Sequence, residues 1–470
     1  MTLRTLGIAC VLVVLAAGQA PAADAPDLSG HWEGEIALPT GPLQLAVDLE
    51  HGESGWKGTI DIPAQGAKGL PLEGILIEGG NATFAISGIP GDPTFTGALE
   101  GGELIGDFTQ GAAQLTFRLG REAVAPIVRP QDPTGPLPYS EEEVTYSNGD
   151  VTLAGTLTLP PGEGPFPAAV LITGSGAQNR DEEIFNHRPF LVLADHLARR
   201  GIAVLRSDDR GVGGSTGDIA TSTTSDFADD VLAAVGLLAG RSEISGNQIG
   251  VVGHSEGGLV GPLAASRSSA VAWVVMLAGP GVAGSEILPF QTRLLTRASG
   301  GDQEQADTQA ELVAEGVAVV LGEPDEAAAL EQLREIANRQ LDIGGEAARE
   351  ALGEDADAVI ESQIKQLVTP WFRYFLAYDP RPTLRQVKVP VLALNGELDL
   401  QVDTEQNLPE VEKALLEGGN EDVTVRRFGG LNHLFQHATT GGIMEYGMIE
   451  ETIAPEVLDV IGSWIEERTD

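Results

Sequence analysis

The sequence has almost no cysteine. Cys10 is the only one among 470 residues, and it lies in an apolar run near the N-terminus that we expect to be removed from the mature protein. A chain without cysteine forms no disulfide bond, offers no thiolate nucleophile and binds no metal through sulfur. Covalent catalysis, where it occurs, must therefore use another side chain.

Positive charge is also scarce. The 28 Lys and Arg residues stand against 69 Asp and Glu residues, which gives a formal net charge of −41 and a pI near 4.3. The acidic residues are spread along the chain rather than gathered in one tail. Such a surface repels phosphate backbones, so nucleic acid is not expected as a partner. A saline habitat and an ordinary soluble, acidic, exported protein both agree with this composition.

The N-terminal apolar run is too short to span a membrane. It covers residues 6–17, whereas a transmembrane helix needs about 20 apolar residues. Arg4 precedes it and small residues follow it up to Ala23, which is the layout of a secretory signal peptide. We therefore expect 1–23 to be a cleaved signal peptide, the mature protein to be periplasmic or secreted, and no membrane span.

Two regions of different periodicity follow, separated by a run of prolines. In 27–122, short alternating apolar and polar stretches stand between Gly, Pro and Asn turns, which predicts an all-β domain, either a sandwich or a barrel. The prolines in 123–140 prevent a helix and favour an extended linker. With 42% hydrophobic residues in so long a chain, two or three folded units are expected.

From residue 141 onward, apolar runs alternate with stretches of helical periodicity. Fully apolar strands that alternate with helices indicate a mostly parallel sheet covered on both faces. This predicts an α/β domain composed of 141–279 and 382–470. Between its two parts, 280–381 is rich in Ala, Glu and Leu and lacks a strand pattern, which predicts a helical insertion.

The strongest chemical motif follows the apolar run 249–252. It is Gly-His-Ser-Glu-Gly-Gly, with Ser255 at its centre, and it stands where a strand turns into a helix. A serine in that context sits on a strained turn with its Oγ above the sheet. The backbone N–H of the next residue, Glu256, then faces the oxyanion that develops during acyl transfer. The motif therefore predicts Ser255 as a nucleophile.

A serine hydroxyl needs a base within hydrogen-bond reach, and an acid to orient that base. His433 lies in a loop after the last predicted strand, 423–428, and is the preferred base, with His437 as the alternative. Asp399 closely follows the strand at 389–394 and is the preferred acid, with Asp403 as the alternative. The chain order Ser, Asp, His agrees with hydrolases that carry this kind of elbow.

A second oxyanion donor is expected in the loop after the strand at 168–172. That loop begins Thr-Gly-Ser-Gly, and its small residues let the backbone approach a substrate carbonyl. We assign the donor to the N–H of Ser175, with Gly176 as the alternative. The following glycine-rich loop carries Asp208 and Arg210, which we interpret as structural, because its glycines lack the dinucleotide-binding spacing. No cofactor is expected.

Five motifs together resemble a known family. They are Gly-Ser-Gly-x-x-x-Arg-Asp after the first parallel strand, Asp-Asp-Arg-Gly-Val-Gly-x-Ser, Gly-His-Ser-Glu-Gly-Gly, Gly-x-Leu-Asp and Asn-His-Leu-Phe. In this order the pattern resembles bacterial serine esterases of the α/β-hydrolase fold, related to the esterase and prolyl-oligopeptidase-like branch with a preceding β domain. The likeness covers 141–470. It implies short-chain carboxylesterase activity on a small-molecule ester, no metal and a helical lid.

Aromatic residues make up only 5% of the chain, yet several cluster near the end of the helical insertion. Both ends of that insertion are expected at the carboxyl edge of the sheet, so its helices should cover Ser255. Trp371 and Phe375 are the candidate lining of an acyl or alcohol pocket, and packing against the core is the alternative.

Two other functions agree with the same motifs. A serine peptidase or amidase would use the same three residues, although the chain lacks the β-propeller of large peptidases with this fold. An exported binding protein with a degenerate hydrolase domain is a different class, and the intact Ser255, Asp399 and His433 argue against it. The oligomeric state and the natural substrate are not encoded in any motif that we recognise.

Overall fold

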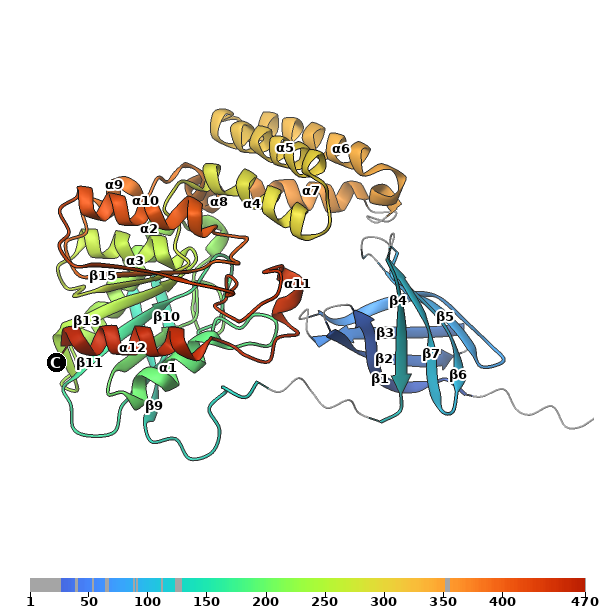
Figure 1. Ribbon diagram of the computed structural model, residues 1–470, viewed down its shortest axis with the longest axis horizontal. Helices are drawn as coiled ribbons and strands as arrows, with labels where there is room; N and C mark the ends of the chain where they lie inside the picture. The colour runs from blue at the N-terminus through green and yellow to red at the C-terminus, as the bar shows by residue number, and fades with distance from the viewer. Residues whose placement is uncertain are drawn as a thin grey trace, which may run out of the picture.

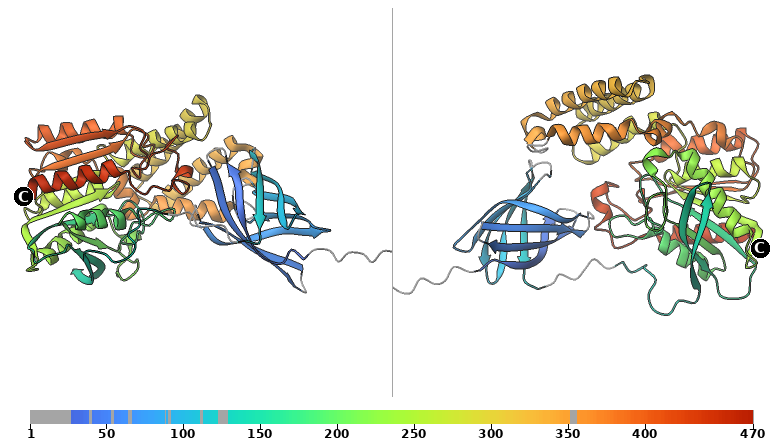
Figure 2. Two further views of the ribbon diagram at one scale, coloured as in Figure 1. Left: turned by 60° about the horizontal axis from the view of Figure 1, so that its bottom comes forward. Right: turned by 180° about the vertical axis from the view of Figure 1, so that it is seen from behind.

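The computed structural model describes residues 27–38, 41–52, 55–63, 67–87, 89, 92–110, 113–122, 129–350 and 356–469. The predicted signal peptide, including Cys10, lies outside the described residues, as does part of the predicted linker, 123–128. Within the described ranges, no helix combines the length and apolarity needed to cross a membrane. Figures 1 and 2 show a β-barrel beside a larger α/β part.

The N-terminal domain is a closed antiparallel barrel in which each strand pairs with the next and β8 pairs with β1. The strands are β1 (Gly30–Leu38), β2 (Gly41–Gly52), β3 (Gly55–Ile62), β4 (Ala67–Glu78), β5 (Asn81–Ile86), β6 (Thr94–Glu100), β7 (Glu103–Gln110) and β8 (Ala113–Gly120). Alternate side chains point inward and fill the interior, where Phe95 contacts Phe84, Phe108 and Phe117. The predicted all-β domain is therefore a barrel with a packed core.

The larger part is built on an eight-stranded sheet with the order β16-β15-β14-β13-β11-β12-β10-β9. Its strands are β9 (Ser140–Asn148), β10 (Val151–Leu159), β11 (Phe166–Ile172), β12 (Ala203–Ser207), β13 (Ile244–His254), β14 (Val274–Leu277), β15 (Val391–Gly396) and β16 (Val423–Phe428). The β9–β10 hairpin is antiparallel, β10 pairs antiparallel with β12, and the other pairs are parallel.

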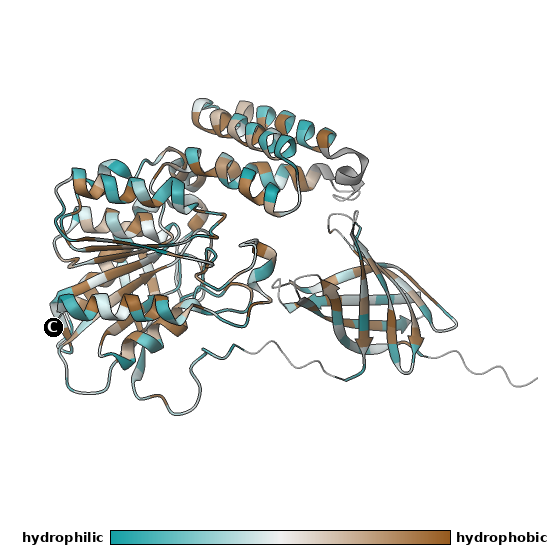
Figure 3. Cartoon of the chain, viewed as in Figure 1, coloured by the Kyte–Doolittle hydropathy of each residue, from teal (hydrophilic) through white to brown (hydrophobic). Residues whose placement is uncertain are grey.

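Helices cover both faces of this sheet (Figure 1). One face packs against α2 (Thr224–Ala239), α3 (Gly257–Arg267) and α10 (Thr404–Glu417), and the other against α1 (Pro189–Arg199) and α12 (Pro455–Thr469). Val251 and Val252 are neighbours on β13, yet they are buried in the two opposite cores. This explains why the central strands are apolar throughout, as their brown colour in Figure 3 shows.

Further helices lie between β14 and β15 in the sequence. They are α4 (Gly284–Ala298), α5 (Gln303–Gly322), α6 (Glu326–Glu350), α7 (Ala356–Leu367), α8 (Pro370–Ala377) and α9 (Arg381–Leu384). The helices α4 to α8 form a separate layer in Figures 1 and 2, whereas α9 lies beside α10. A small core of their own, which includes Val320, Leu333, Ile364 and Leu376, holds this layer together. We call α4 to α8 the cap.

Element boundaries differ from the expectation where polar residues continue a strand. β13 begins at Ile244, five residues before the apolar run, and its polar start is paired with β11 through Phe166. Conversely, β14 begins at Val274 although the apolar run begins at Val271. The carboxyl ends of the parallel strands still lie at one edge of the sheet, and the cap leaves and re-enters the domain there.

Candidate active site

Ser255 lies at a sharp turn between β13 and α3. Its φ is +51°, a left-handed conformation that is strained for a residue with a side chain. The turn is tight, because a Cβ on Gly253 would lie 2.0 Å from the carbonyl oxygen of Gly257, and one on Gly257 would lie 2.3 Å from that of Ile172. Glycine is thus required on both sides of the serine, and the local geometry is that of a nucleophile elbow.

His433 and Asp399 form a buried pair at the same edge of the sheet. Nδ1 of His433 is 2.8 Å from Oδ2 of Asp399, and the other carboxylate oxygen accepts the N–H groups of Gln401 at 2.8 Å and Val402 at 2.9 Å. Both side chains are almost completely buried. The carboxylate is therefore fixed by the backbone and can in turn fix the imidazole.

The two alternative residues point elsewhere. Asp403 caps α10, where its carboxylate accepts the N–H of Gln406 at 2.8 Å. His437 is exposed and contacts Glu451 and Glu456. Asp399 and His433 are thus the pair that the structure brings together.

Ser255 and His433 line one cavity of about 270 Å³ between the sheet edge and the cap. The cap contributes mainly apolar side chains from α4 and α8, including Ile287, Leu288 and Phe372. Trp371 and Phe375 also line this cavity, and their rings stack with centroids 5.9 Å apart. The aromatic cluster is thereby divided, because Tyr374 and Tyr378 stack on each other and are not part of this lining.

Backbone amides suited to hold an oxyanion lie beside Ser255. Among the described residues, no acceptor is found for the backbone N–H of Glu256, at the first turn of α3, or for those of Ser175 and Gly176. Ser175 lines the cavity of Ser255, whereas Gly176 lines a smaller neighbouring one. This placement agrees better with Ser175 than with Gly176 as the second donor.

The side chain of Glu256 has a role in the site that the motif did not indicate. It is 3% exposed and accepts hydrogen bonds from Thr224 Oγ1 at 2.7 Å and from Trp371 Nε1 at 3.0 Å. Burial raises the pKa of this carboxyl, and the hydrogen bonds from Thr224, Trp371 and Ser175 offset the rise in part. Glu256 therefore connects the elbow to the cap through Trp371, for which the sequence predicted pocket lining or packing against the core.

Buried acids brace the loop that carries Ser175. Asp209 accepts the hydroxyl of Thr173 at 2.8 Å and the N–H of Gln178 at 2.9 Å, at the two ends of that loop. Burial raises the pKa of Asp209 to about 7, against the effect of these hydrogen bonds. Glu182 accepts the N–H of Gly174 at 2.7 Å. The sequence analysis assigned a role to neither acid, although Asp209 stands in the Asp-Asp-Arg-Gly-Val-Gly-x-Ser motif.

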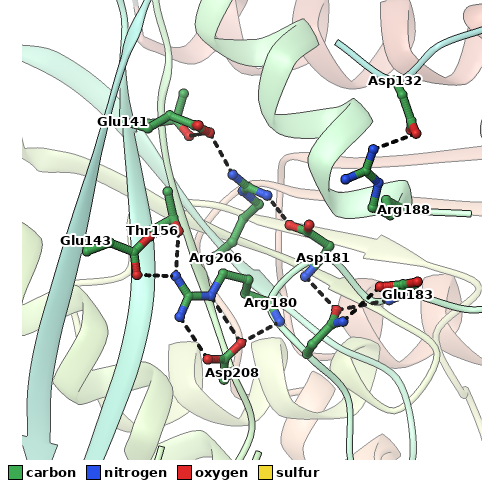
Figure 4. A network of polar contacts seen from close by, with 12 residues as sticks. Asp132, Glu141, Glu143, Thr156, Arg180, Asp181, Glu183, Arg188, Arg206 and Asp208 are labelled. Atoms are coloured by element: carbon green, nitrogen blue, oxygen red, sulfur yellow. Dashed lines mark hydrogen bonds and ion pairs between the residues drawn. The ribbon is translucent and has the colours of Figure 1, made fainter. Parts of the chain in front are cut away.

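A polar network supports the same loop from behind (Figure 4). Arg180 donates to Asp208 at 2.8 Å and to Glu143 at 2.6 Å. Burial raises the pKa of Asp208, but the hydrogen bonds of Arg180 and of Gly214 outweigh it and the pKa is lowered. Arg210 pairs with Asp230 on α2 at 2.7 Å. Asp208 and Arg210 thus have the structural contacts expected of them.

No cluster of three or more His, Cys, Asp or Glu side chains suited to a metal ion occurs in the part of the chain that the structure describes. The chemistry that this arrangement can support is acyl transfer, with a serine nucleophile, a histidine that can take its proton and amides that can hold the oxyanion.

Comparisons with known proteins agree with this reading of the fold. A family model described as serine aminopeptidase, S33, matches residues 188–301, a range that contains the elbow. The esterase EstD of Thermotoga maritima is 29% identical over 338 residues, which cover 71% of this chain and 69% of EstD.

Solved structures also match at low identity. An esterase of Pyrococcus furiosus is 15% identical, with a TM-score of 0.44 over 74% of this chain and all of that one. The α/β-hydrolase GrgF of a Penicillium species is 17% identical, with a TM-score of 0.43 over 71% and 99% of the two chains.

The mostly parallel sheet and the strained serine elbow at its carboxyl edge define the class: the chain has the α/β-hydrolase fold. It is similar in sequence to the esterase EstD, and it carries an N-terminal eight-stranded β-barrel.

Proposed function

We propose that this chain is a carboxylesterase that cleaves short-chain esters through an acyl-enzyme on Ser255. One observation carries the proposal: a serine on a strained elbow lines the same cavity as His433, whose Nδ1 is paired with the buried Asp399. The similarity to the esterase EstD supports it independently of the geometry.

In the proposed reaction, Oγ of Ser255 attacks the ester carbonyl while Nε2 of His433 takes the hydroxyl proton. Asp399 accepts the Nδ1–H of His433, which keeps Nε2 free to act as the base. The N–H groups of Glu256 and Ser175, or Gly176, would hold the oxyanion. His433 then protonates the leaving alcohol, and a water molecule, activated in the same way, releases the acid.

The cavity supports a small, uncharged substrate. A volume of about 270 Å³ is at the lower end of what drug-sized ligands need, which favours short acyl groups. No Lys or Arg is among its lining residues, and the lining histidines His254 and His433 are already paired with Glu182 and Asp399, so a negatively charged substituent is disfavoured there. The apolar side chains of the cap offer the surface on which an acyl chain would pack.

Peptide or amide cleavage is the second candidate, because the matched family model is that of serine aminopeptidases. The comparison that separates the two is kcat/KM for aryl esters against kcat/KM for peptide anilides. A carboxylesterase hydrolyses the esters and leaves the anilides essentially untouched, and faster anilide cleavage would favour the peptidase.

We also infer that the protein acts outside the cytoplasm. The inference rests on the sequence, where Arg4, the apolar run 6–17 and the small residues up to Ala23 form a signal-peptide pattern. N-terminal sequencing of the protein purified from the periplasm or the medium tests it, and a chain that keeps its first 20 residues in the cytoplasm contradicts it.

The nucleophile is tested with Ser255→Ala. The variant keeps Cβ and therefore the packing of the elbow, but turnover of aryl esters should fall by a factor of about 10⁶, to background. Labelling by a serine-directed phosphonate should also be lost. Ser299→Ala, at an exposed serine that ends α4, is the matched control and should behave as wild type. If Ser255→Ala kept a tenth of the activity, the assignment would be wrong.

A further inference from the structure

A second histidine lies directly beside the proposed base. His254 is the last residue of β13, it is buried, and its ring centroid is 4.8 Å from that of His433. Nδ1 of His254 is 2.9 Å from Oε1 of Glu182, and Nε2 is 3.0 Å from the backbone carbonyl oxygen of His433. Neither nitrogen faces Ser255 in these contacts, so His254 is not a second base.

Its partners determine the protonation of His254. A backbone carbonyl only accepts hydrogen bonds, so Nε2 must carry a hydrogen. Nδ1 faces a carboxylate oxygen that already accepts the N–H of Gly174, so Nδ1 donates as well. An imidazole that donates from both nitrogens is a cation. Burial lowers the pKa of His254, but the charge and hydrogen bond of Glu182 outweigh it, and the pKa is raised.

The pair formed by Glu182 and His254 connects three loops of the site. Glu182 holds the N–H of Gly174 at the start of the loop that carries Ser175. His254 is adjacent to Ser255 in the chain, and it holds the carbonyl group of His433. Asp399 fixes the ring of His433, whereas His254 fixes its backbone.

We propose that Glu182 and His254 are positioning residues for the proposed ester hydrolysis. As a buried carboxylate–imidazolium pair, they fix the loop that carries His433 and the loop that carries Ser175 in position relative to Ser255. The other ionisable groups that face His254 are Asp399 and His433 itself. The pair acts through its contacts to Gly174 and to the backbone of His433, and neither residue touches the reacting atoms. The proposal rests on the proposed function, because it assigns a purpose to the alignment of Ser255 and His433.

Glu182→Gln tests the pair with almost no change of shape. The neutral amide no longer stabilises an imidazolium, so His254 keeps one hydrogen, on Nε2. The atom that replaces Oε1 then meets both the N–H of Gly174 and the lone pair of Nδ1. An oxygen there satisfies only the first and an NH₂ group only the second.

The resulting misalignment is expected to lower kcat by about 10- to 100-fold, with KM within threefold of wild type. Turnover is divided by the number of sites that react with a serine-directed phosphonate, so that a loss of folded protein does not count as a loss of catalysis.

Glu183→Gln is the matched control. Glu183 is the next residue of the same loop, but it is exposed and its side chain accepts a hydrogen bond from Asn179. The variant should keep the wild-type kcat. The double variant Glu182→Gln with His254→Gln should cost about as much as the worse single variant, because the two residues act as a unit.

Two results would overturn the proposal: a wild-type kcat per titrated site in Glu182→Gln, or a loss confined to KM. If Glu182→Gln yields no reactive sites, the same measurement on His254→Gln decides, with the same expected loss of kcat. A failure of the proposed function is distinguishable, because the wild-type protein would then neither hydrolyse aryl esters nor react with the phosphonate.

Discussion

Replacing Asp399 by Asn should nearly abolish turnover without unfolding the protein. The reason lies in the three hydrogen bonds of this carboxylate. Oδ1 accepts the N–H groups of Gln401 and Val402 at 2.8 and 2.9 Å, and Oδ2 accepts Nδ1–H of His433 at 2.8 Å. In the variant, the amide oxygen must occupy the first position, because an NH₂ group there would face two donors. The NH₂ group is then directed at Nδ1 of His433.

An imidazole that accepts a hydrogen bond at Nδ1 carries its own hydrogen on Nε2. In this tautomer His433 cannot take the proton of Ser255. The same substitution in a serine protease with this arrangement lowers kcat by about 10⁴-fold, which corresponds to about 5 kcal/mol of activation free energy. The expected loss here is of that size, because the geometry around the carboxylate imposes the same tautomer.

The assay is kcat for an aryl acetate, divided by the concentration of sites that react with a phosphonate, together with thermal unfolding. Asp403→Asn is the control, because Asp403 caps α10 and Asn is an equally good N-cap, so activity and stability should not change. A folded Asp399→Asn variant within tenfold of the wild-type kcat would refute the reasoning.

Two further predictions follow from the cavity and from a buried histidine. Replacing Trp371 and Phe375 by Ala enlarges the cavity on its cap side and should shift the kcat/KM preference from acetate towards octanoate esters; an unchanged preference in a folded variant would show that the acyl group binds elsewhere. His187 is buried, and burial lowers its pKa from an ordinary 6.5 to about 4. The neutral form of His187 is thus favoured in the folded state. Its contribution to the free energy of unfolding is fully present above pH 6.5 and decreases by about 3 kcal/mol as the pH falls towards 4. Between pH 7 and pH 4, the free energy of unfolding in urea should decrease less in His187→Gln than in the wild type, by about that amount. An equal decrease in both proteins would contradict the lowered pKa of His187.

The positions of the three proposed catalytic residues were predictable because each is tied to the end of a strand. Ser255 follows β13, Asp399 follows β15, and His433 follows β16 after a short loop. Parallel strands bring their carboxyl ends to one edge, so three residues far apart in the chain meet there. The local pattern thus located the strands, and a general rule of α/β topology assembled the site.

The backbone conformation of the loop was needed to choose between the neighbouring candidates His433 and His437. His433 and His437 stand in one short loop, where Phe435 has a φ of +60° and the chain turns back on itself. That turn places one histidine beside Asp399 and the other in solvent. No propensity of Leu, Phe or Gln predicts a left-handed phenylalanine. The preference for His433 therefore rested on its place in the loop after the strand, with His437 expected on the following turn or helix.

The barrel shows the same division between local and long-range information. Alternating residues predicted strands, because each inward side chain fills the core and each outward one meets solvent. Closure is different, because it depends on β1 pairing with β8, where Glu33 lies opposite Gly120. This pairing joins the first and the last strand of the domain, which are far apart in the sequence. A sandwich would show the same alternation of apolar and polar residues, so the alternation alone does not predict closure.

Glu182, Asp209 and Glu256 show most clearly what sequence patterns omit. A buried carboxylate is costly unless its oxygens are satisfied, so an acid side chain without an assigned role is expected at the surface. Here the donors come from remote elements: Trp371 from the cap and Thr224 from α2 for Glu256, and the backbone of the oxyanion loop for the other two. These carboxylates can be buried because the N–H and O–H groups of these elements satisfy their oxygens. The loops around Ser255 are thus held in place by buried carboxylates, and the precision of the site depends on side chains to which the motifs assigned no role.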